Sequence, residues 1–158
     1  MKYTLFTLSL IVIGFCANAQ KLTESQAPAN VMKTFKARYP SIHEAKWEKE
    51  DVNYESNFRI NKLETSAIFD SEGNLIETET EIPKSSLPKA VSDAVVRDYA
   101  DHKIEETAKI DKNGIITYEV EVEKGEKSFD LIYDEKGKFL TTTPVNEKKK
   151  RKNKEISA

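Results

Sequence analysis

Two stretches of the chain place apolar residues on one face of a helix. In each stretch the apolar positions recur every four residues, a spacing that stacks their side chains on one helical face. A proline precedes each stretch, where a first helical turn tolerates it, and Pro40 ends the first stretch. The spaced residues are Val31, Phe35 and Tyr39 in the first stretch, and Val91, Val95 and Tyr99 in the second. The pattern predicts helices over residues 28–39 and 87–99.

Each predicted helix is followed by segments in which apolar and polar residues alternate. A period of two is typical of strands with one buried face and one solvated face. The apolar positions include Tyr54, Phe58 and Phe69 after the first helix, and Tyr118, Val122 and Tyr133 after the second. We expect about four antiparallel strands in each half, with the helix covering one face of them, which makes an α+β fold.

The two halves of the chain repeat one another in the same order. Helix positions match at an offset of 60 residues and strand positions at an offset of 64, which indicates a four-residue insertion around "DKNG" at residues 111–114. The segments "FDSEGNL" (69–75) and "YDEKGKF" (133–139) also match, with Asp and Gly at the first and fourth turn positions. The sequence therefore predicts two tandem α-β4 repeats, one over residues 20–84 and one over residues 85–146.

The N-terminus has the features of a secretory signal peptide. Lys2 supplies a positive charge, "TLFTLSLIVIGF" an apolar segment and "ANA" a cleavage site of small residues. We expect residues 1–19 to be removed between Ala19 and Gln20, which places the protein in the periplasm or outside the cell. The apolar run is too short to span a bilayer, so we predict no membrane span. The only cysteine, Cys16, leaves with this segment, so the mature chain has no disulfide or thiol chemistry.

Charge is distributed unevenly along the chain. Residues 147–158 lack apolar periodicity and hold six Lys/Arg residues, so we predict a disordered basic tail. Contact of this tail with anionic envelope polymers or lipid head groups stays an alternative. The body from Gln20 to Asn146 holds 18 Lys/Arg residues against 25 Asp/Glu residues. This acidic balance argues against nucleic-acid binding, which needs a basic surface.

The sequence contains no motif for catalysis, metal binding or cofactor binding. It has no G-x-S-x-G, no Walker loop and no G-x-G-x-x-G, and its two histidines, His43 and His102, have no further ligands at a recognised spacing. The Asp-x-x-Gly turns lack the alternate oxygen ligands of an EF-hand loop. We therefore predict a protein that is not an enzyme and that has no cofactor or metal.

The sheet face away from the helices is predicted to be polar, solvated and open. "ETETE" (77–81) and "EVEVE" (119–123) place carboxylates there, in water rather than in the enclosed site that a paired-carboxylate hydrolase needs. Isoleucines interrupt this face, and a polar rim around apolar residues is typical of a protein-binding patch. The alternative is that they are ordinary strand formers. The predicted protein-binding face comprises Arg59, Glu64, Ile68, Ile76, Glu119, Glu121, Asp130 and Ile132.

Together these features resemble the PepSY-like, β-lactamase-inhibitor-like family of exported bacterial proteins. The resemblance rests on a Pro-led helix with V-x-x-x-(F/V)-x-x-x-Y that occurs twice, on strands that end in (F/Y)-D-x-x-G, and on Trp47, and it covers about residues 27–143. It implies one continuous antiparallel sheet with both helices packed on one face and the opposite face open. It also implies a binding role for that open face, as in β-lactamase inhibitory protein. That protein relies on disulfides, whereas this mature chain has none.

The function predicted on these grounds is that of a non-enzymatic exported module. It binds or inhibits an envelope or secreted protein through the open sheet face. The alternative is an envelope ligand sensor that binds a cation or a cationic peptide on its acidic surface.

Overall fold

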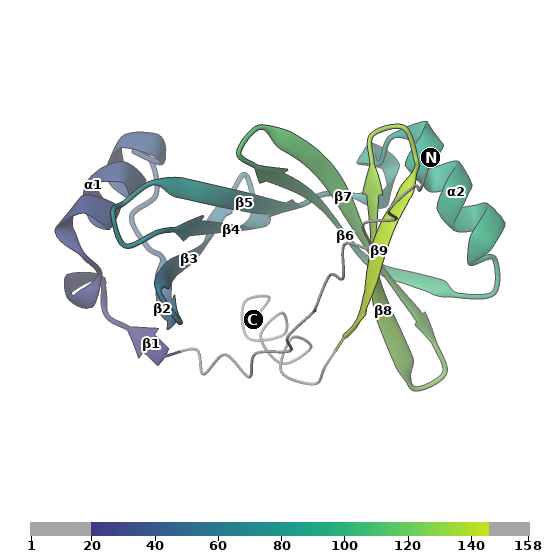
Figure 1. Cartoon of the computed structure of the whole chain (residues 1–158), viewed down its shortest axis with the longest axis horizontal. Helices are drawn as coiled ribbons and strands as arrows, with labels where there is room; N and C mark the ends of the chain where they lie inside the picture. The colour runs from purple at the N-terminus through teal and green to yellow at the C-terminus, as the bar shows by residue number, and fades with distance from the viewer. Residues whose placement is uncertain (1–19, 146–158) are drawn as a thin grey trace, which may run out of the picture.

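The computed structural model describes residues 20–145, which form two α-helices packed against one antiparallel sheet (Figure 1). The predicted signal segment and the predicted basic tail lie outside the described residues. The strands are β1 (Gln20–Leu22), β2 (Lys46–Glu50), β3 (Asn53–Ile60), β4 (Leu63–Phe69), β5 (Leu75–Glu81), β6 (Lys103–Lys112), β7 (Ile115–Lys124), β8 (Lys127–Asp134) and β9 (Phe139–Pro144). The helices are α1 (Ala29–Arg38) and α2 (Lys89–Asp98), preceded by the 3₁₀ turns η1 (Glu24–Gln26) and η2 (Lys84–Ser86).

The strands lie in the sheet in the order in which they occur in the sequence, and each pairs antiparallel with the next. Strands β5 and β6 pair directly over Glu77–Lys112 to Glu81–Ala108, so the two halves form one continuous sheet. The sequence predicted about four strands in each half, and the structure has these eight. It adds the three-residue strand β1, which pairs with β2 at the edge of the sheet.

The register of the strands shows that both helices cover the same face. One row of directly paired residues crosses four strands through Thr65, Thr80, Lys109 and Tyr118. On β4 this face includes Ala67, which is buried in the core with α1, and on β7 it includes Val120, which is buried in the core with α2. Figure 1 shows the sheet arched, with the helices on its convex side and the other face turned inward. The predicted α+β fold, with both helices on one face and the opposite face open, is confirmed.

Each helix covers its own hydrophobic core. Under α1 the core is aromatic, because the Phe35 ring lies 5.0 Å from the Trp47 ring and 5.3 Å from the Phe58 ring in edge-to-face contacts. Under α2 the equivalent helix position is Val95, and it packs with aliphatic residues and tyrosines of β7 and β8. The repeats therefore share their pattern of buried positions and differ in the side chains that fill them.

The repeated Asp-x-x-Gly turns are closed by their aspartates. The carboxylate of Asp70 accepts hydrogen bonds from the backbone of Glu72 and from both the backbone and the side chain of Asn74, at 2.8–2.9 Å. These bonds, the one from the Asn74 side chain first, lower the pKa of Asp70. Asp134 likewise accepts from the backbone N–H groups of Lys136 and Lys138, both at 2.9 Å. Each turn is thus held by the acid that the sequence placed at its first position.

The glycines of these turns allow each turn to lie against a helix. Gly73 and Gly137 have φ values of +87° and +76°, in the left-handed region that favours glycine. A Cβ added to Gly73 would lie 2.8 Å from the backbone of Asn30, and one added to Gly137 would lie 2.6 Å from the carbonyl carbon of Ala90. Glycine is therefore required at each position for two reasons, the backbone conformation and the close approach of the helix.

Candidate protein-binding face

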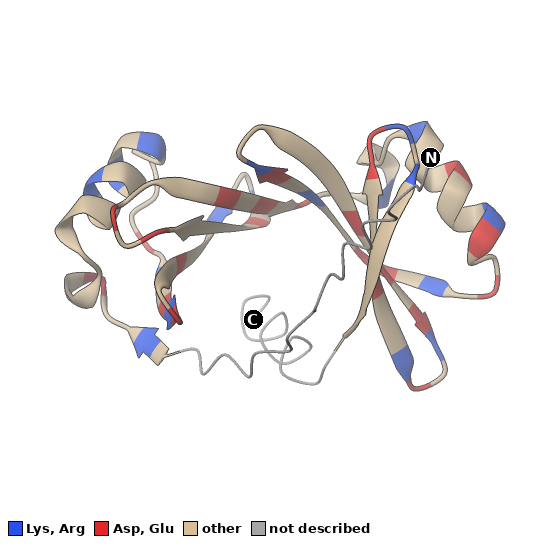
Figure 2. Ribbon diagram, in the orientation of Figure 1, with Lys and Arg blue, Asp and Glu red and all other residues tan. Residues whose placement is uncertain are grey.

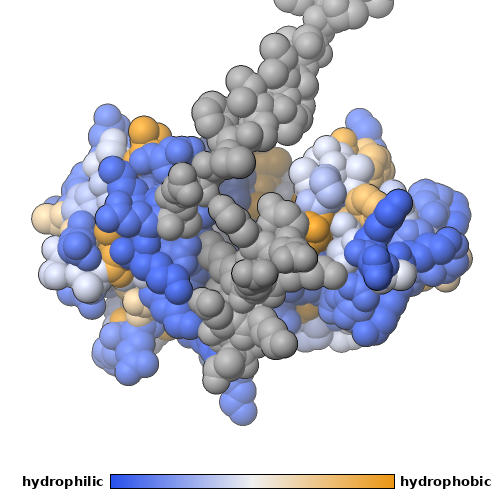
Figure 3. Space-filling model, turned by 90° about the horizontal axis from the view of Figure 1, so that it is seen from below, coloured by the Kyte–Doolittle hydropathy of each residue, from blue (hydrophilic) through white to orange (hydrophobic). Residues whose placement is uncertain are grey.

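The face that carries no helix is built by alternate residues of the strands, and we refer to it as the concave face. Tyr54, Ser56 and Phe58 of β3 point toward α1, so Glu55 and Asn57 between them point to the concave face. The same alternation continues across the paired strands to β9. Seen from below Figure 1, the molecule is mostly hydrophilic, with separate apolar spots (Figure 3).

Two predicted apolar residues occupy equivalent places on this face. Ile68 of β4 lies directly opposite Glu55 of β3, and Ile132 of β8 lies directly opposite Glu119 of β7. Both isoleucines are partly exposed. The structure therefore repeats an isoleucine–glutamate pair in the two halves of the concave face, as the sequence offset of 64 predicted.

Arg59 and Glu64 lie at one end of the concave face, on the hairpin between β3 and β4. They are directly opposite one another in the register, and their side chains form an ion pair of 2.9 Å. Their side chains are 48% and 20% exposed, so water screens the pair and its contribution to stability is about 0–1 kcal/mol.

Ile76 does not lie in register with the other isoleucines. The pairing of β4 with β5 shifts at this point, because Ile68 pairs with Glu77 and Phe69 pairs with Leu75. Ile76 therefore falls in a β-bulge, and its carbonyl accepts a hydrogen bond from Asn113 of the neighbouring hairpin at 3.2 Å. Simple alternation along β5 is broken by the bulge, so the register does not join Ile76 to the row of Ile68.

Three acidic residues form a row across β6, β7 and β8, which we call the acidic row. Glu106 lies directly opposite Glu121, and Glu121 lies directly opposite Asp130. The sequence predicted that such carboxylates would be solvated, but only 6% of Glu121 and 5% of Asp130 is exposed. This part of the prediction was therefore wrong.

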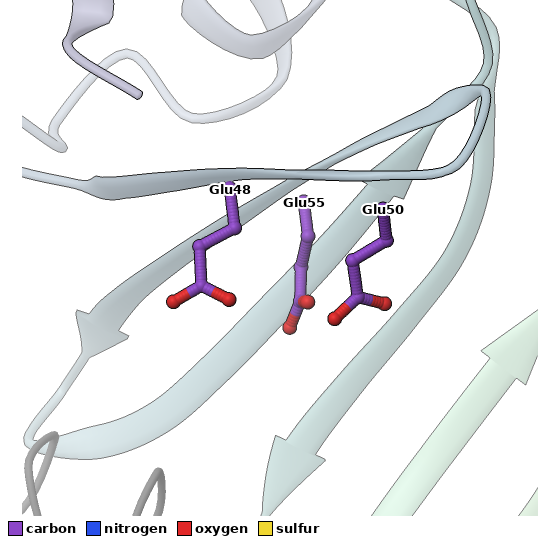
Figure 4. A group of neighbouring side chains, drawn as sticks. All are labelled: Glu48, Glu50 and Glu55. Atoms are coloured by element: carbon purple, nitrogen blue, oxygen red, sulfur yellow. The ribbon is translucent and has the colours of Figure 1, made fainter. Parts of the chain in front are cut away.

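A second acidic group lies at the other end of the concave face, which we call the glutamate cluster. It consists of Glu48 and Glu50 on β2 and Glu55 on β3, and one carboxylate oxygen of each lies within 4.8 Å of the others (Figure 4). Sequence reasoning missed this group. The signal was the alternation of glutamates in "KWEKE" (46–50), but only the register, which sets Glu48 opposite Glu55, brings the third carboxylate to them.

The concave face is therefore an acidic surface with two symmetric apolar positions. Acidic residues lie on strands of both repeats (Figure 2). Like charges directly opposite one another in a sheet are destabilising unless other groups compensate them, and Glu106 and Glu121 lie opposite one another in this way. Carboxylate oxygens in such groups can also hold a hard cation.

Comparison with known proteins agrees with this architecture. The family model described as "Putative beta-lactamase-inhibitor-like, PepSY-like" matches the chain over residues 16–77 and again over residues 53–141. The chain belongs to this family. The two matches of the PepSY-like model accord with the tandem repeats. Among curated proteins, none is significantly similar to this chain in sequence.

Several solved structures share the fold of this PepSY-like chain. A BLIP-like protein from Bacteroides fragilis NCTC 9343 is 27% identical, with a TM-score of 0.66 over 75% of this chain and 86% of that chain. A DUF2874 family protein from Bacteroides ovatus ATCC 8483 is 25% identical, with a TM-score of 0.69 over 75% and 87%. One of a group of "putative periplasmic proteins" from Bacteroides eggerthii DSM 20697 is 18% identical, with a TM-score of 0.72 over 75% and 89%, and shows the fold alone.

The inhibitor-like description of the family supports a non-catalytic, inhibitor-like module. It also indicates proteins as the class of partner. Within residues 20–145, neither helix is long and apolar enough to cross a membrane.

Proposed function

We propose that this chain is an exported, non-enzymatic module that binds or inhibits another envelope or secreted protein through its concave face. The observation that carries the proposal is the pair of equivalent isoleucines, Ile68 and Ile132, on the sheet face that no helix covers. Each is a partly exposed apolar side chain with a glutamate directly opposite it. Apolar positions within a polar rim are the anatomy of a protein interface.

The physical gain from such an interface comes from removing these side chains from water. Fully burying an isoleucine side chain stabilises a complex by about 1.5–3 kcal/mol, and two isoleucines at symmetric positions can contact one continuous partner surface. The surrounding carboxylates and the Arg59–Glu64 pair add orientation and specificity rather than affinity.

The proposed site of action is the bacterial envelope or its surroundings. It rests on the signal-like N-terminus, with cleavage between Ala19 and Gln20, and on the periplasmic description of the Bacteroides eggerthii neighbour. The mature chain would then consist of the two repeats over residues 20–84 and 85–146, followed by the basic tail. All strands and both hydrophobic cores described above lie within residues 20–145.

The test is a pull-down from native envelope and culture-supernatant fractions, with the chain from Gln20 to Ala158 as bait. The test variant is the double substitution Ile68→Asp/Ile132→Asp. The matched control is Val52→Asp/Val96→Asp, which also replaces two exposed apolar side chains by aspartate. Val52 lies in the β2–β3 turn and is 70% exposed, and Val96 lies on α2 and is 63% exposed. Circular dichroism and thermal melting establish that both variants are folded.

We expect a partner that is captured by the wild type and by the control but not by the Ile68→Asp/Ile132→Asp variant. A partner held equally by all three proteins would show that the isoleucine pair is not the binding surface. A partner lost in both variants would point to a general loss of structure, which the melting curves would reveal.

A second candidate function follows from the acidic row and the glutamate cluster. Opposed carboxylates favour a cation or a cationic peptide, so the chain can also act as an envelope ligand sensor. Calcium or a short oligolysine should then raise the melting temperature of the wild type by linkage, and Glu48→Gln/Glu50→Gln should reduce that shift. No shift with either ligand at low salt would argue against the sensor.

A further inference from the structure

Strand β9 forms one edge of the sheet. Within residues 20–145 it pairs with β8 alone, and all six of its residues are exposed (Figure 1). They include two large apolar side chains, of which Phe139 is 43% and Leu140 is 45% exposed. An edge strand of this kind offers backbone N–H and C=O groups to a further strand.

The first repeat shows that the corresponding side of the strand is able to pair. At the offset of 64 residues β9 is equivalent to β5, and the second side of β5 carries β6. Thr78 of β5 pairs with Asp111 there, and the carbonyl of Ile76 accepts a hydrogen bond of 3.2 Å from Asn113. Both strands also have a β-bulge at the same place in their pairing with the preceding strand. Strand β9 thus has the backbone form of a strand that is paired on both sides.

Thr142 presents its backbone to the second side of β9. The N–H of Val145 donates to the carbonyl of Ser128 beside β8, and successive residues of an antiparallel pair point their backbone groups alternately toward and away from the partner strand. Thr143 therefore points its N–H and C=O toward β8, and Thr142 and Pro144 point theirs away. Proline has no N–H, so pairing on this side is centred on Thr142.

Charge narrows the choice of partner strand. Strand β5 has three glutamates, of which Glu77 forms an ion pair of 2.8 Å with Lys112 of β6. Strand β9 has threonine or valine at the equivalent positions, and of the nine strands within residues 20–145 it alone lacks a charged residue. A charged partner strand would gain no ion pair on β9, whereas an uncharged strand loses none. A second copy of β9 is such a strand.

The opposite edge of the sheet is covered, which limits how copies of the chain can join. Strand β1 pairs with β2 from Gln20–Lys49 to Leu22–Trp47 and so lies where β5 lies on β6. A head-to-tail array, in which β9 of one copy pairs with β2 of the next, would have to displace β1. Pairing of β9 with β9 displaces no strand, and a two-fold axis closes it.

We propose that two copies of the chain pair antiparallel along β9, about a two-fold axis that passes between their Thr142 residues. Each Thr142 N–H then donates to the Thr142 carbonyl of the other copy. Thr141 lies opposite Thr143, and Leu140 lies opposite Pro144, of the other copy. Threonine pairs directly opposite one another in a sheet are favourable, and no like charges meet along the pair.

The proposed dimer has a defined geometry. The axis is perpendicular to the sheet, as it is for any symmetric antiparallel pair of strands within one sheet, so the two concave faces lie on the same side of one joined sheet. Ile132 is close to the axis, because it lies opposite Thr141 of β9. The dimer goes beyond the proposed function and would present two copies of the concave face to a partner.

The contact is small, so we expect a reversible dimer. Two six-residue strands contribute far fewer residues than the about 20–30 on each side of a standard interface. The chain should therefore be monomeric when dilute and dimeric when concentrated.

Sedimentation equilibrium of the chain from Gln20 to Ala158 tests the proposal. From about 10 μM to about 1 mM, the weight-average mass of the wild type should rise from that of a monomer toward twice that value. Thr142→Lys should remain monomeric, because it places two like charges opposite one another at the axis. Gln20→Lys, a matched change at an exposed position of the edge strand β1, should behave as the wild type.

Disulfide cross-linking tests the register. The chain from Gln20 to Ala158 has no cysteine, so Thr142→Cys supplies a single thiol. Directly opposite residues of an antiparallel pair have Cα atoms about 4.5–5.5 Å apart, which a disulfide spans. Thr142→Cys should therefore form a covalent dimer under mild oxidation much faster than Gln20→Cys. Both positions are exposed and outside the two hydrophobic cores, and thermal melting verifies that the variants are folded.

Three outcomes would overturn the proposal. A wild type that stays monomeric up to about 1 mM would show that β9 does not pair with itself. A dimer that persists in Thr142→Lys and is lost in Gln20→Lys would place the contact at the β1 edge. A dimer that is lost in Ile68→Asp/Ile132→Asp but kept in Thr142→Lys would place it on the concave face. No partner protein is present, so failure of the dimer is distinguishable from failure of the proposed function in the pull-down.

Discussion

Replacement of Gly137 by alanine would test how the repeated turn packs against its helix. Gly137 has a φ of +76°, and a Cβ on it would lie 2.6 Å from the carbonyl carbon of Ala90. That carbon belongs to the backbone of α2, so it cannot move aside as the end of a flexible side chain would. Gly114 has a φ of +83°, but a Cβ there would meet nothing within 4 Å. Comparison of the two glycines therefore separates backbone strain from steric overlap.

The expected magnitudes follow from these two contributions. The left-handed conformation costs an L-residue about 1–2 kcal/mol, and Gly114→Ala should lower the free energy of unfolding by this amount alone. Forcing an additional methyl group into a packed site costs about 1–3 kcal/mol more. We therefore expect Gly137→Ala to cost about 2–5 kcal/mol in total. Gly73→Ala, whose Cβ would lie 2.8 Å from the backbone of Asn30, should also exceed the control.

The assay is equilibrium unfolding in urea at 25 °C, followed by circular dichroism and by the fluorescence of Trp47, the single tryptophan. Linear extrapolation yields the free energy of unfolding of each variant, and equal m-values would show that the variants unfold from comparable states. Equal losses for Gly137→Ala and Gly114→Ala would refute the reasoning. They would mean that the helix and the turn can separate without cost, so that close approach does not select glycine at this position.

Two further predictions concern pH. Hydrogen bonds, chiefly from the Asn74 side chain, lower the pKa of Asp70 below its ordinary value of 3.8. Their stabilisation is therefore present above about pH 3.8 and is lost as the pH falls through the folded-state pKa. The free energy of unfolding of Asp70→Asn should therefore differ most from that of the wild type above this pH and approach it in acid. A constant difference in urea unfolding from about pH 2 to about pH 6 would contradict this. Burial raises the pKa of Tyr133 to about 12, so the stability that depends on the neutral phenol is present below pH 10 and is lost as the pH rises toward 12. Among the described residues the Tyr133 hydroxyl has no hydrogen-bond partner. Tyr133→Phe should therefore keep or raise the free energy of unfolding at neutral pH and remove its decrease at alkaline pH. A clear decrease in the free energy of unfolding at about pH 7 would instead show that the hydroxyl makes a hydrogen bond.

Local patterns in the sequence were sufficient to predict the repeated helices and turns. Val31 and Val91 are both fully buried, as the period of four predicted. The Asp-x-x-Gly segments form turns whose aspartates accept backbone hydrogen bonds. These features depend on a few neighbouring residues, and the physics of helical spacing and turn hydrogen bonding acts over the same short range.

The candidate site was only partly accessible from the sequence. Ile68 and Ile132 could be assigned to the uncovered face because strand alternation is local. The place of Ile76 could not, because a bulge between β4 and β5 changes the alternation and depends on the pairing of two strands. The glutamate cluster was missed for a similar reason, since the third carboxylate reaches Glu48 and Glu50 only through the register of β2 with β3.

The sequence by itself determined the two helices, the alternating strands, the duplicated order and the acidic balance of this protein, because each is written in residue type and spacing. Only the tertiary structure decided which carboxylates lie close together and how exposed they are. Register selects which charges lie opposite one another across strands, and in the folded sheet only 6% of Glu121 and 5% of Asp130 is exposed. Both are properties of paired strands rather than of any one strand, so no single segment of the chain encodes them.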